Sequence, residues 1–385
     1  MRKYQRTIEK DIEDYLTSDD YEIFFIWGPR RSGKTTLLKQ LSEKLSVPVF
    51  NFDILSDREP FVRTREALGK LASDHKIILI DEIQNYPEGT IAVKILHDEY
   101  KVKIIATGSS ELRQKSKDFD TLAGRFTEHF CLPLSIYEIT QNSKFPTYEE
   151  SNFLQKLQKD LQIFGAYPEV YTNTDLLEAQ KIDLLQIIFD TYILKDIIDI
   201  YNLKNTKLAK DILTKIALQI GSEVSINEIA NDLKATASTV SDYIEIFIKN
   251  YVLIPLPSFK TNLRRAVSAN RKLFFYDLGI RNILVKDFRE LDIRPDKGGV
   301  FENFIVSEIE KQRRNQKVHQ SLYFYREYGG KEVDLILEDY KKKYTSVEIK
   351  ITKGSAKDIF PLPNKSEVVT SQNYFEKIAV ILKGK

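Results

Sequence analysis

Runs of apolar residues in the first third of the chain predict buried strands alternating with helices. Tyr21–Trp27 is a continuous apolar run of strand length, and a second run covers Ile77–Ile80. A third, Lys101–Ser110, ends in polar residues, and Leu37–Leu45 has the apolar spacing of a helix. Continuous apolar strands are typical of parallel sheets covered by helices, so we expect an α/β region here.

The rest of the chain changes from a helical pattern to an alternating one. From about Thr172 to Ser222, apolar residues recur every three or four positions, as in packed helices. Ser225–Leu256 has the pattern of two short helices followed by an apolar strand, and Ser225 is expected to cap the first helix. A helix with Phe301 on its buried side precedes Ser321–Thr352, which alternates like a meander of strands.

Composition changes this picture little. The 385 residues, 42% hydrophobic and 30% charged, suggest two or three domains with a buried core. The net charge of +2 gives no general case for nucleic-acid binding, and one cysteine with four histidines excludes the common zinc sites. The first residues read as an amphipathic helix, and no apolar run approaches the roughly 20 residues that span a bilayer. We therefore expect a cytoplasmic protein without a membrane segment.

A glycine-rich segment directly follows the first apolar run. It matches G-x-x-x-x-G-K-[ST] between a strand and a helix, where backbone N–H groups and the helix N-terminus surround phosphates. Lys34 is expected to reach the β- and γ-phosphates, and the Thr35 hydroxyl to bind Mg²⁺. The expected ATP-binding residues are Gly28, Pro29, Arg30, Arg31, Ser32, Gly33, Lys34, Thr35 and Thr36.

Polar residues end the second and third apolar runs. Asp81 and Glu82 stand at the carboxyl end of a strand, where open α/β sheets bind ligands. Asp81 is expected to hold the Mg²⁺ shell and Glu82 to polarise the attacking water. Thr107 and Ser109 are expected to sense the γ-phosphate or the water. For each pair, a simple polar turn at the strand end is the alternative.

Arg125 precedes another predicted strand, within "DTLAGRFTEHFCLPLSIYE". An arginine at this place can act as a finger that neutralises charge in the transition state of phosphoryl transfer. The alternative is an ordinary surface arginine.

The order of these motifs resembles that of the prokaryotic AAA-type ATPases of the archaeal and signalling-ATPase branch. The resemblance is carried by "GPRRSGKTTLL", "IILIDEIQNYP", "IIATGSS", "LAGRF" and "LPLSIYE", and by "FGAYPEV", which resembles the family's Gly-x-x-Pro motif at the start of its helical lid. It implies that the glycine-rich segment, the acidic pair and the polar strand end are the phosphate loop, the Walker B pair and the sensor. Arg125 matches the family's Gly-Arg position, which does not by itself assign a finger.

The region Ser225–Leu256 resembles a winged helix-turn-helix, which that family carries here. A helix that reads DNA needs Arg, Lys, Asn or Gln, but the second helix offers the carboxylates Asp242 and Glu245. The pattern therefore argues against major-groove contact by this helix. The expected contacts with nucleic-acid phosphates lie in the basic stretch that follows, and a solvated loop is the alternative. Its basic residues are Lys260, Arg264, Arg265, Arg271 and Lys272.

A predicted hairpin near the C-terminus carries acids among its apolar residues. With its turn centred near Lys341, Asp334 lies opposite Glu348 and Glu332 opposite Lys350, with Cβ atoms about 5 Å apart. Opposed carboxylates repel unless a cation lies between them, which predicts a Mg²⁺ site. Lys350 is then placed to orient a water or stabilise developing charge. A cross-strand ion pair between Glu332 and Lys350 is the alternative.

This spacing resembles the core of PD-(D/E)XK nucleases, and the family's terminal domain has the same arrangement, including "FEN", "FYRE", "EVD" and "VEIK". The resemblance implies Asp334, Glu348 and Glu302 as metal ligands and Lys350 as a catalytic residue.

The expected fold is α/β, in four parts. These are a P-loop AAA-type parallel-sheet domain at 1–145, a helical lid or linker at 146–205, a winged helix at 206–275 and a restriction-endonuclease-like α/β domain at 276–385. Two functions remain open. One is an enzyme that hydrolyses ATP with Mg²⁺ and processes DNA; the other is an ATP-driven switch whose nuclease-like domain is an inactive scaffold. The expected partners are nucleotide and DNA, and a homo-oligomer is left open.

Overall fold

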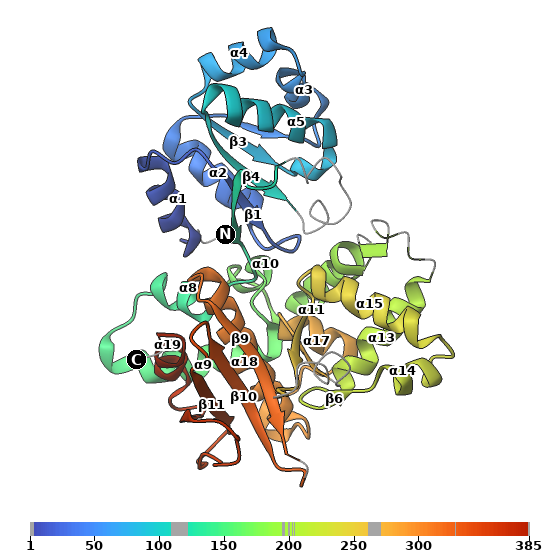
Figure 1. Ribbon diagram of the computed structural model, residues 1–385. Coiled ribbons are helices and arrows are strands. Elements are labelled where there is room, and N and C mark those ends of the chain that lie inside the picture. Colours follow the sequence, from blue (N-terminus) through green and yellow to red (C-terminus); the bar gives the residue numbers. More distant parts are fainter. Residues whose placement is uncertain are drawn as a thin grey trace. The chain divides into compact units, whose positions relative to one another are not determined.

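The computed structural model describes residues 4–108, 122–194, 197–198, 201, 203, 205–260, 271–327 and 329–383 (Figure 1). The chain forms two compact units. Residues Gln5–Pro133 make the N-terminal unit, and the C-terminal unit begins at Leu134 and includes Tyr4. The first unit thus ends before the boundary at 145 that the sequence suggested.

The N-terminal unit is built on a five-stranded parallel sheet with the strand order β2-β3-β4-β1-β5. Because β4 lies between β1 and β3, it separates the strand before the glycine-rich segment from the strand that ends in Asp81. The parallel α/β fold predicted from the apolar runs is confirmed. The strands are β1 (Ile23–Trp27), β2 (Val49–Asn51), β3 (Ile77–Asp81), β4 (Lys103–Gly108) and β5 (Phe126–Phe130).

Two helices share a core with the strands of this sheet. Ile12 of α1 and Leu38 of α2 pack with Phe24, Ile26 and Ile105. The amphipathic helix expected at the N-terminus is therefore present, with its apolar side against the sheet. The helices and helical turns of the unit are α1 (Ile8–Thr17), α2 (Lys34–Leu45), α3 (Leu55–Arg58), η1 (Glu59–Phe61), α4 (Arg65–Asp74), η2 (Ile83–Asn85), α5 (Pro87–Ile95) and η3 (Leu96–Tyr100).

One hydrophobic core joins most of the helices in the first half of the C-terminal unit. It runs from Ile163 through Ile212 and Phe247 to Leu284. The helices expected as a lid, those expected as a winged helix, and a helix assigned to the following domain all contribute to this core. The elements of this part are α8 (Ile136–Gln141), η4 (Thr147–Glu149), α9 (Glu150–Phe164), α10 (Pro168–Tyr171), α11 (Glu178–Ile187), η5 (Ile188–Leu194), α13 (Thr206–Leu218), α14 (Ile226–Asp232), α15 (Ala237–Lys249), α17 (Leu278–Val285) and η6 (Leu291–Ile293).

A small antiparallel sheet of order β6-β8-β7 accompanies α13, α14 and α15. Its strands are β6 (Glu223–Val224), β7 (Leu253–Pro257) and β8 (Arg271–Phe275). The resulting order is helix, strand, two helices and two strands. A winged helix stays a prediction for this part of the chain. The segment 261–270 between β7 and β8, with Arg264 and Arg265, lies outside the described residues.

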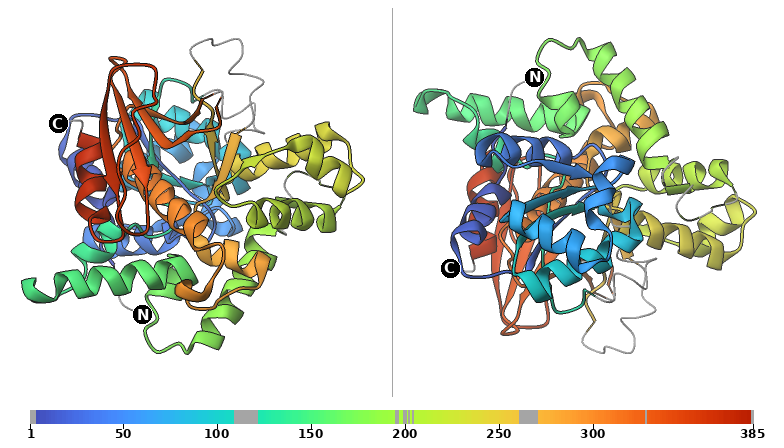
Figure 2. Two further views of the ribbon diagram at one scale, coloured as in Figure 1. Left: turned by 90° about the horizontal axis from the view of Figure 1, so that it is seen from below. Right: turned by 90° about the horizontal axis from the view of Figure 1, so that it is seen from above.

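The last part of the chain forms a four-stranded sheet of order β12-β11-β10-β9. The strands β9 to β11 are antiparallel, whereas β12 runs parallel to β11. Helices α18 and α19 pack beside each other, α18 near β11 and α19 on β12 (Figure 2). The elements are α18 (Lys297–Asn315), β9 (Gln320–Arg326), β10 (Glu332–Asp339), β11 (Tyr344–Ile349), β12 (Asn364–Val369) and α19 (Tyr374–Lys383).

The register of the predicted hairpin is confirmed. Leu335 pairs with Val347 and Ile336 with Ser346, and one further step puts Asp334 across from Glu348. On the other side of β10, the pairing with β9 shifts between Val333 and Ile336, so Asp334 and Leu335 lie in a β-bulge or a similar irregularity. Bulges of this kind re-aim side chains and are common beside functional sites.

The "LPLSIYE" motif begins the C-terminal unit and is bound tightly to α18. Ser135 caps α8 through a capping box with Glu138. The Glu308 carboxylate accepts a hydrogen bond from Ile136 N at 2.8 Å, and Lys311 donates to Leu134 O at 3.2 Å and to Glu308 Oε1 at 2.8 Å. Glu308 and Lys311 are both buried. The segment that leaves the N-terminal unit is thus held by a buried ion pair of a distant helix.

In the "FGAYPEV" motif, the structure gives Gly165 a clear role. Its backbone has φ +73 and ψ −166, and a Cβ here would lie 2.1 Å from Asp277 Oδ1. The Asp277 carboxylate accepts hydrogen bonds from Ala166 N at 2.6 Å and Ile280 N at 3.1 Å, and so caps α17. A side chain at this position would be strained and would displace the cap.

Gly165→Ala is therefore expected to lower the free energy of unfolding by about 2–4 kcal/mol, from backbone strain and the lost cap. Urea unfolding of the purified variant measures this loss. Gly298→Ala is the matched control, because Gly298 lies in α18 with open space around its Cα and no positive φ. A loss at Gly165 no larger than the change at Gly298 would contradict this role.

Candidate functional site

The glycine-rich loop lies between β1 and α2, as its motif requires. Cys131 N donates to Trp27 O at 2.7 Å, and the Cys131 carbonyl oxygen would lie 2.0 Å from a Cβ on Gly28, so only glycine fits there. Lys34 is only 4% exposed, and its Nζ donates to Gly28 O and Pro29 O, both at 2.9 Å. The ammonium group is thus turned back into the loop, where phosphates would compete with the two carbonyls.

Three side chains meet at the carboxyl ends of β3 and β4 and the start of α2. Thr107 Oγ1 donates to Asp81 Oδ1, and Thr35 lies near enough to this carboxylate to lower its pKa. Burial raises the pKa of Asp81, and the bond from Thr107 partly offsets that rise. The hydroxyl and carboxylate oxygens brought together here are the ligands that Mg²⁺ prefers, so these residues fit that ion.

Glu82 follows Asp81 in a left-handed backbone conformation, with φ 52. Its Oε2 accepts a hydrogen bond from Gln84 Nε2, and its N–H lies 3.4 Å from Thr107 Oγ1. Gln84 is a residue of this site that the sequence analysis does not predict. Its one signal is its place two residues after the acidic pair, in "DEIQN".

The structure does not bring Arg125 to the phosphate loop of its own chain. Arg125 precedes β5, and Phe126 pairs with Ile23 at the amino end of β1, whereas the loop follows Trp27 at the carboxyl end. The length of a five-residue strand, about 16 Å, separates the two ends. Arg125 Nε instead donates to Asp98 Oδ1 at 2.8 Å, which lowers the pKa of Asp98.

This position does not fit a finger that acts within the same chain. A finger directed at a neighbouring copy stays a prediction, and a surface arginine paired with Asp98 is the alternative. Ser109, the other candidate sensor, lies outside the described residues.

A second cluster of charges lies at the ends of β10 and β11. Asp334 Oδ2 accepts hydrogen bonds from Ile349 N at 2.7 Å and Lys350 Nζ at 3.0 Å. Glu348, only 1% exposed, has Oε2 at 3.1 Å from Lys350 Nζ and 3.2 Å from Lys357 Nζ. Its Oε1 has no hydrogen-bond partner among the described residues. Burial, and then the nearby Asp334, raise the pKa of Glu348.

Lys272 of β8 reaches into the same region. It is 1% exposed, and its Nζ lies 2.8 Å from Glu302 Oε1 and 2.5 Å from Glu332 Oε1. Arg326 binds the other oxygen of Glu332 and also Glu223. Lys272 is therefore a buried counter-ion, and its predicted role as a surface contact to nucleic acid is wrong. The cross-strand ion pair between Glu332 and Lys350, which was the alternative to a metal site, is not formed either, because Glu332 pairs with Lys272 and Arg326.

The other residues of the basic stretch are only partly available. Arg271 Nη2 lies 2.7 Å from Glu245 Oε1, so an acid of α15 offsets its charge. Lys260 is partly exposed at the end of the described segment. With Arg264 and Arg265 outside the described residues, a phosphate-binding role for this stretch stays a prediction.

The carboxylates of the acidic cluster are close enough to one another to hold a metal ion, but nearby lysine and arginine side chains already neutralise part of their charge. Glu302, Glu332 and Asp334 each place a carboxylate oxygen within 4.8 Å of the others, so Glu332 takes the place predicted for Glu348 in this group. Burial raises the pKa of Glu302 to about 7 despite the nearby Lys272. The oxygen ligands suit Mg²⁺, but the ion would have to displace lysine ammonium groups.

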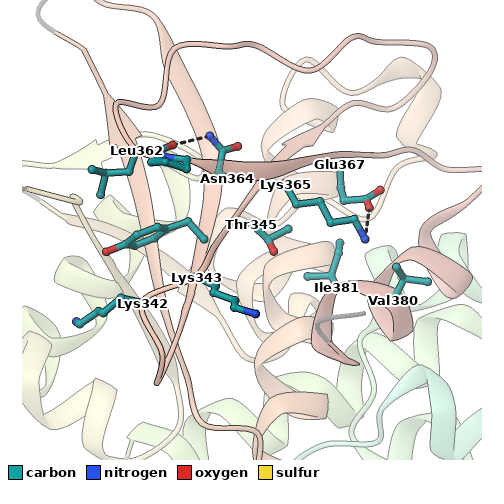
Figure 3. Close-up of a pocket in the computed structure, with 11 residues that line it drawn as sticks. Lys342, Lys343, Thr345, Leu362, Asn364, Lys365, Glu367, Val380 and Ile381 are labelled. Carbon is teal, nitrogen blue, oxygen red and sulfur yellow. Dashed lines mark hydrogen bonds and ion pairs between the residues drawn. The ribbon is translucent and has the colours of Figure 1, made fainter.

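A separate pocket of about 640 Å³ lies near the turn of the β10–β11 hairpin (Figure 3). Lys343, Thr345 and Lys365 line it on the sheet side, and Val380 and Ile381 of α19 close it. Neither the residues of the phosphate loop nor those of the acidic cluster line this pocket.

Comparison with known proteins assigns the N-terminal unit. Residues 20–140 match the model of the AAA domain, residues 155–292 a domain of unknown function (DUF8612) and residues 297–375 another (DUF4143). With its parallel sheet and its strand–loop–helix motif, the N-terminal unit is an AAA-type P-loop domain, as predicted. The match at 155–292 spans the residues that share the helical core.

The chain is also similar to individual proteins. It is 26% identical over 408 aligned positions to an uncharacterized protein of Methanocaldococcus jannaschii, covering 98% of this chain and 88% of the relative. It is 24% identical over 274 positions to an uncharacterized protein of Haemophilus influenzae, covering 66% of this chain and 67% of the relative. Among solved structures, it matches the Thermotoga maritima RuvB Holliday junction branch migration motor at 14% identity and TM-score 0.29, over 66% of this chain and 90% of RuvB.

Among the described residues, no helix has the length and apolarity to cross a membrane.

Proposed function

We propose that this protein binds ATP with Mg²⁺ at the phosphate loop and hydrolyses it. The observation that carries the proposal is the meeting of Thr35, Asp81 and Thr107 directly beside the loop that holds Lys34. A bound Mg²⁺ neutralises charge on the β- and γ-phosphates, and Thr35 and Asp81 are the residues that would hold it.

The chain's own residues divide the remaining work. Lys34 exchanges its two carbonyl partners for phosphate oxygens. Glu82 leaves the Gln84 amide and orients the attacking water. Thr107 holds the Asp81 carboxylate and the Glu82 backbone in place. The test is phosphate release from ATP by the purified chain, with Lys34→Ala as the reference variant.

A second candidate function concerns the acidic cluster, and the meeting of Asp334, Glu348 and Lys350 favours it. We propose a Mg²⁺-dependent phosphodiesterase acting on DNA, in which the carboxylates hold the ion and Lys350 stabilises charge at the phosphate. Contacts to DNA by Lys260, Arg264 and Arg265 belong to this proposal. The ion pairs of Lys272, Lys350 and Lys357 support the alternative, a domain that binds partners without cutting.

For the nuclease proposal, we expect cleavage of single- or double-stranded DNA in Mg²⁺ or Mn²⁺ that Asp334→Ala reduces by about 100-fold or more. The reduction is expected because the variant loses a carboxylate that would bind the metal ion. Gel analysis of labelled DNA measures the rate of cleavage. Asp358→Ala, which removes an exposed acid in the loop after β11, is the control and is expected to cut like wild type. Cleavage that ignores Asp334→Ala would come from another site, and no cleavage of any substrate would leave the non-cutting scaffold.

A further inference from the structure

Arg6 lies outside every motif, yet its side chain contacts the phosphate loop. Only 7% of the residue is exposed. Its Nη1 donates to Ser32 O at 2.8 Å, and its Nη2 donates to Leu132 O at 2.6 Å. One guanidinium group therefore joins the loop to the segment that follows β5.

The contact with Ser32 fixes the direction of a peptide unit in the loop. The C=O of Ser32 and the N–H of Gly33 belong to the same planar, trans peptide unit and point in opposite directions. When Arg6 holds the carbonyl, the N–H of Gly33 is turned away from Arg6. Backbone N–H groups of such a loop bind phosphate oxygens only when several of them point into the concave side of the loop, where the phosphates bind. The Cys131 thiol lies 3.5 Å from the same carbonyl oxygen and holds the unit from a second point.

We infer that Arg6 is a positioning residue for phosphate binding, which keeps the Ser32–Gly33 peptide unit in the orientation that binds phosphate. The inference rests on the proposed ATPase function. Arginine suits this place because its planar fork reaches two carbonyls at once and stays charged when buried. Its charge behind the loop also adds to the attraction for a polyphosphate.

The same unit contains a matched control. Lys103 is also a buried cation, 9% exposed, and donates to the carbonyl oxygens of Ser18 at 2.6 Å, Asp20 at 3.2 Å and Tyr15. It binds the carboxyl end of α1, whereas Arg6 precedes the amino end of the same helix and binds the loop. Removing either cation leaves backbone carbonyls without a charged donor. Only Arg6 binds a carbonyl of the phosphate loop.

The experiment measures the Kd of ATP and of inorganic tripolyphosphate by calorimetry, together with thermal unfolding. Arg6→Ala is expected to weaken both ligands by about tenfold or more, since an oriented N–H and a nearby charge are lost. Arg6→Lys should recover part of the affinity, because one carbonyl can still be held. Lys103→Met is expected to keep the ATP affinity within about twofold of wild type, although it also lowers the unfolding temperature.

If Arg6→Ala and Lys103→Met change ligand affinity alike, Arg6 only supports the fold and the inference is overturned. Where Arg6→Ala does not fold, the comparison of Arg6→Lys with Lys103→Met decides in the same way. Wild type and Lys34→Ala belong in the same series. If wild type binds no ATP, the ATPase proposal fails. If Lys34→Ala loses ATP while Arg6→Ala and Arg6→Lys bind like wild type, only the role of Arg6 fails.

Discussion

Lys34→Ala is expected to reduce ATP hydrolysis to background, a loss of at least about 1,000-fold. The Lys34 ammonium is the charge that the loop itself offers to the β- and γ-phosphates. It already lies against the Gly28 and Pro29 carbonyls inside the loop. Alanine removes this charge where negative charge moves during phosphoryl transfer. A coupled assay of phosphate release, run with and without a chelator of Mg²⁺, measures the effect.

Lys39→Ala is the control for this variant, because Lys39 is an exposed lysine on the same helix. It is expected to hydrolyse ATP like wild type. Metal-dependent hydrolysis that survives in Lys34→Ala at the wild-type rate would remove the assignment of the nucleotide site. Both variants are purified in parallel, so that a difference between their rates of hydrolysis comes from the position of the lysine and not from the preparation.

Lys272→Met is expected to lower the free energy of unfolding by about 3–5 kcal/mol. Methionine fills the space of the lysine stem but leaves Glu302 and Glu332 close together without the ammonium between them. Arg326 still neutralises part of the charge of Glu332, whereas Glu302 loses the partner that opposes the effect of burial on its pKa. Urea unfolding followed by circular dichroism measures the loss.

A second substitution tests the cause. In Lys272→Met combined with Glu302→Gln, the carboxylate that has no other cationic partner among the described residues is removed, so most of the lost stability should return. Lys342→Met is the surface control, because its partner Glu338 is buried but Lys342 itself is exposed. Little change is expected there. If Lys272→Met unfolds like Lys342→Met, the buried ion triad does not hold the C-terminal unit together.

The phosphate loop and the acidic cluster depend on residues that lie at different distances along the chain. The phosphate loop was predictable because its residues are consecutive and the apolar run and helix around it are read directly from the sequence. The hairpin register was predictable because a short turn centred near Lys341 fixes which residues of the two strands are opposite each other. Lys272 was predicted to contact nucleic acid because a run of basic residues is typical of an exposed loop. The neighbouring sequence does not show that Lys272 lies among Glu302 and Glu332.

The boundaries of the four domains stay a prediction for a similar reason. Helical spacing predicted the helices from 172 onwards, but spacing does not say which helices share a core. The common core from Ile163 to Leu284 joins parts that the sequence suggested as a lid, a winged helix and a terminal domain. Buried faces look alike along the chain, and only their packing partners distinguish one domain from the next.

By itself, the sequence determined the parallel α/β fold of the N-terminal unit, its phosphate loop and acidic pair, and the register that opposes Asp334 and Glu348. These features depend on residues that are close in the chain, where backbone geometry alone sets the spacing. The tertiary structure decided which charges meet. It put Arg6 on Ser32, Arg125 away from its own phosphate loop, and Lys272 between Glu302 and Glu332. The residues next to a charged side chain in the sequence do not show which residue it pairs with, because its partner lies on a segment that is distant in the sequence and close only in the fold.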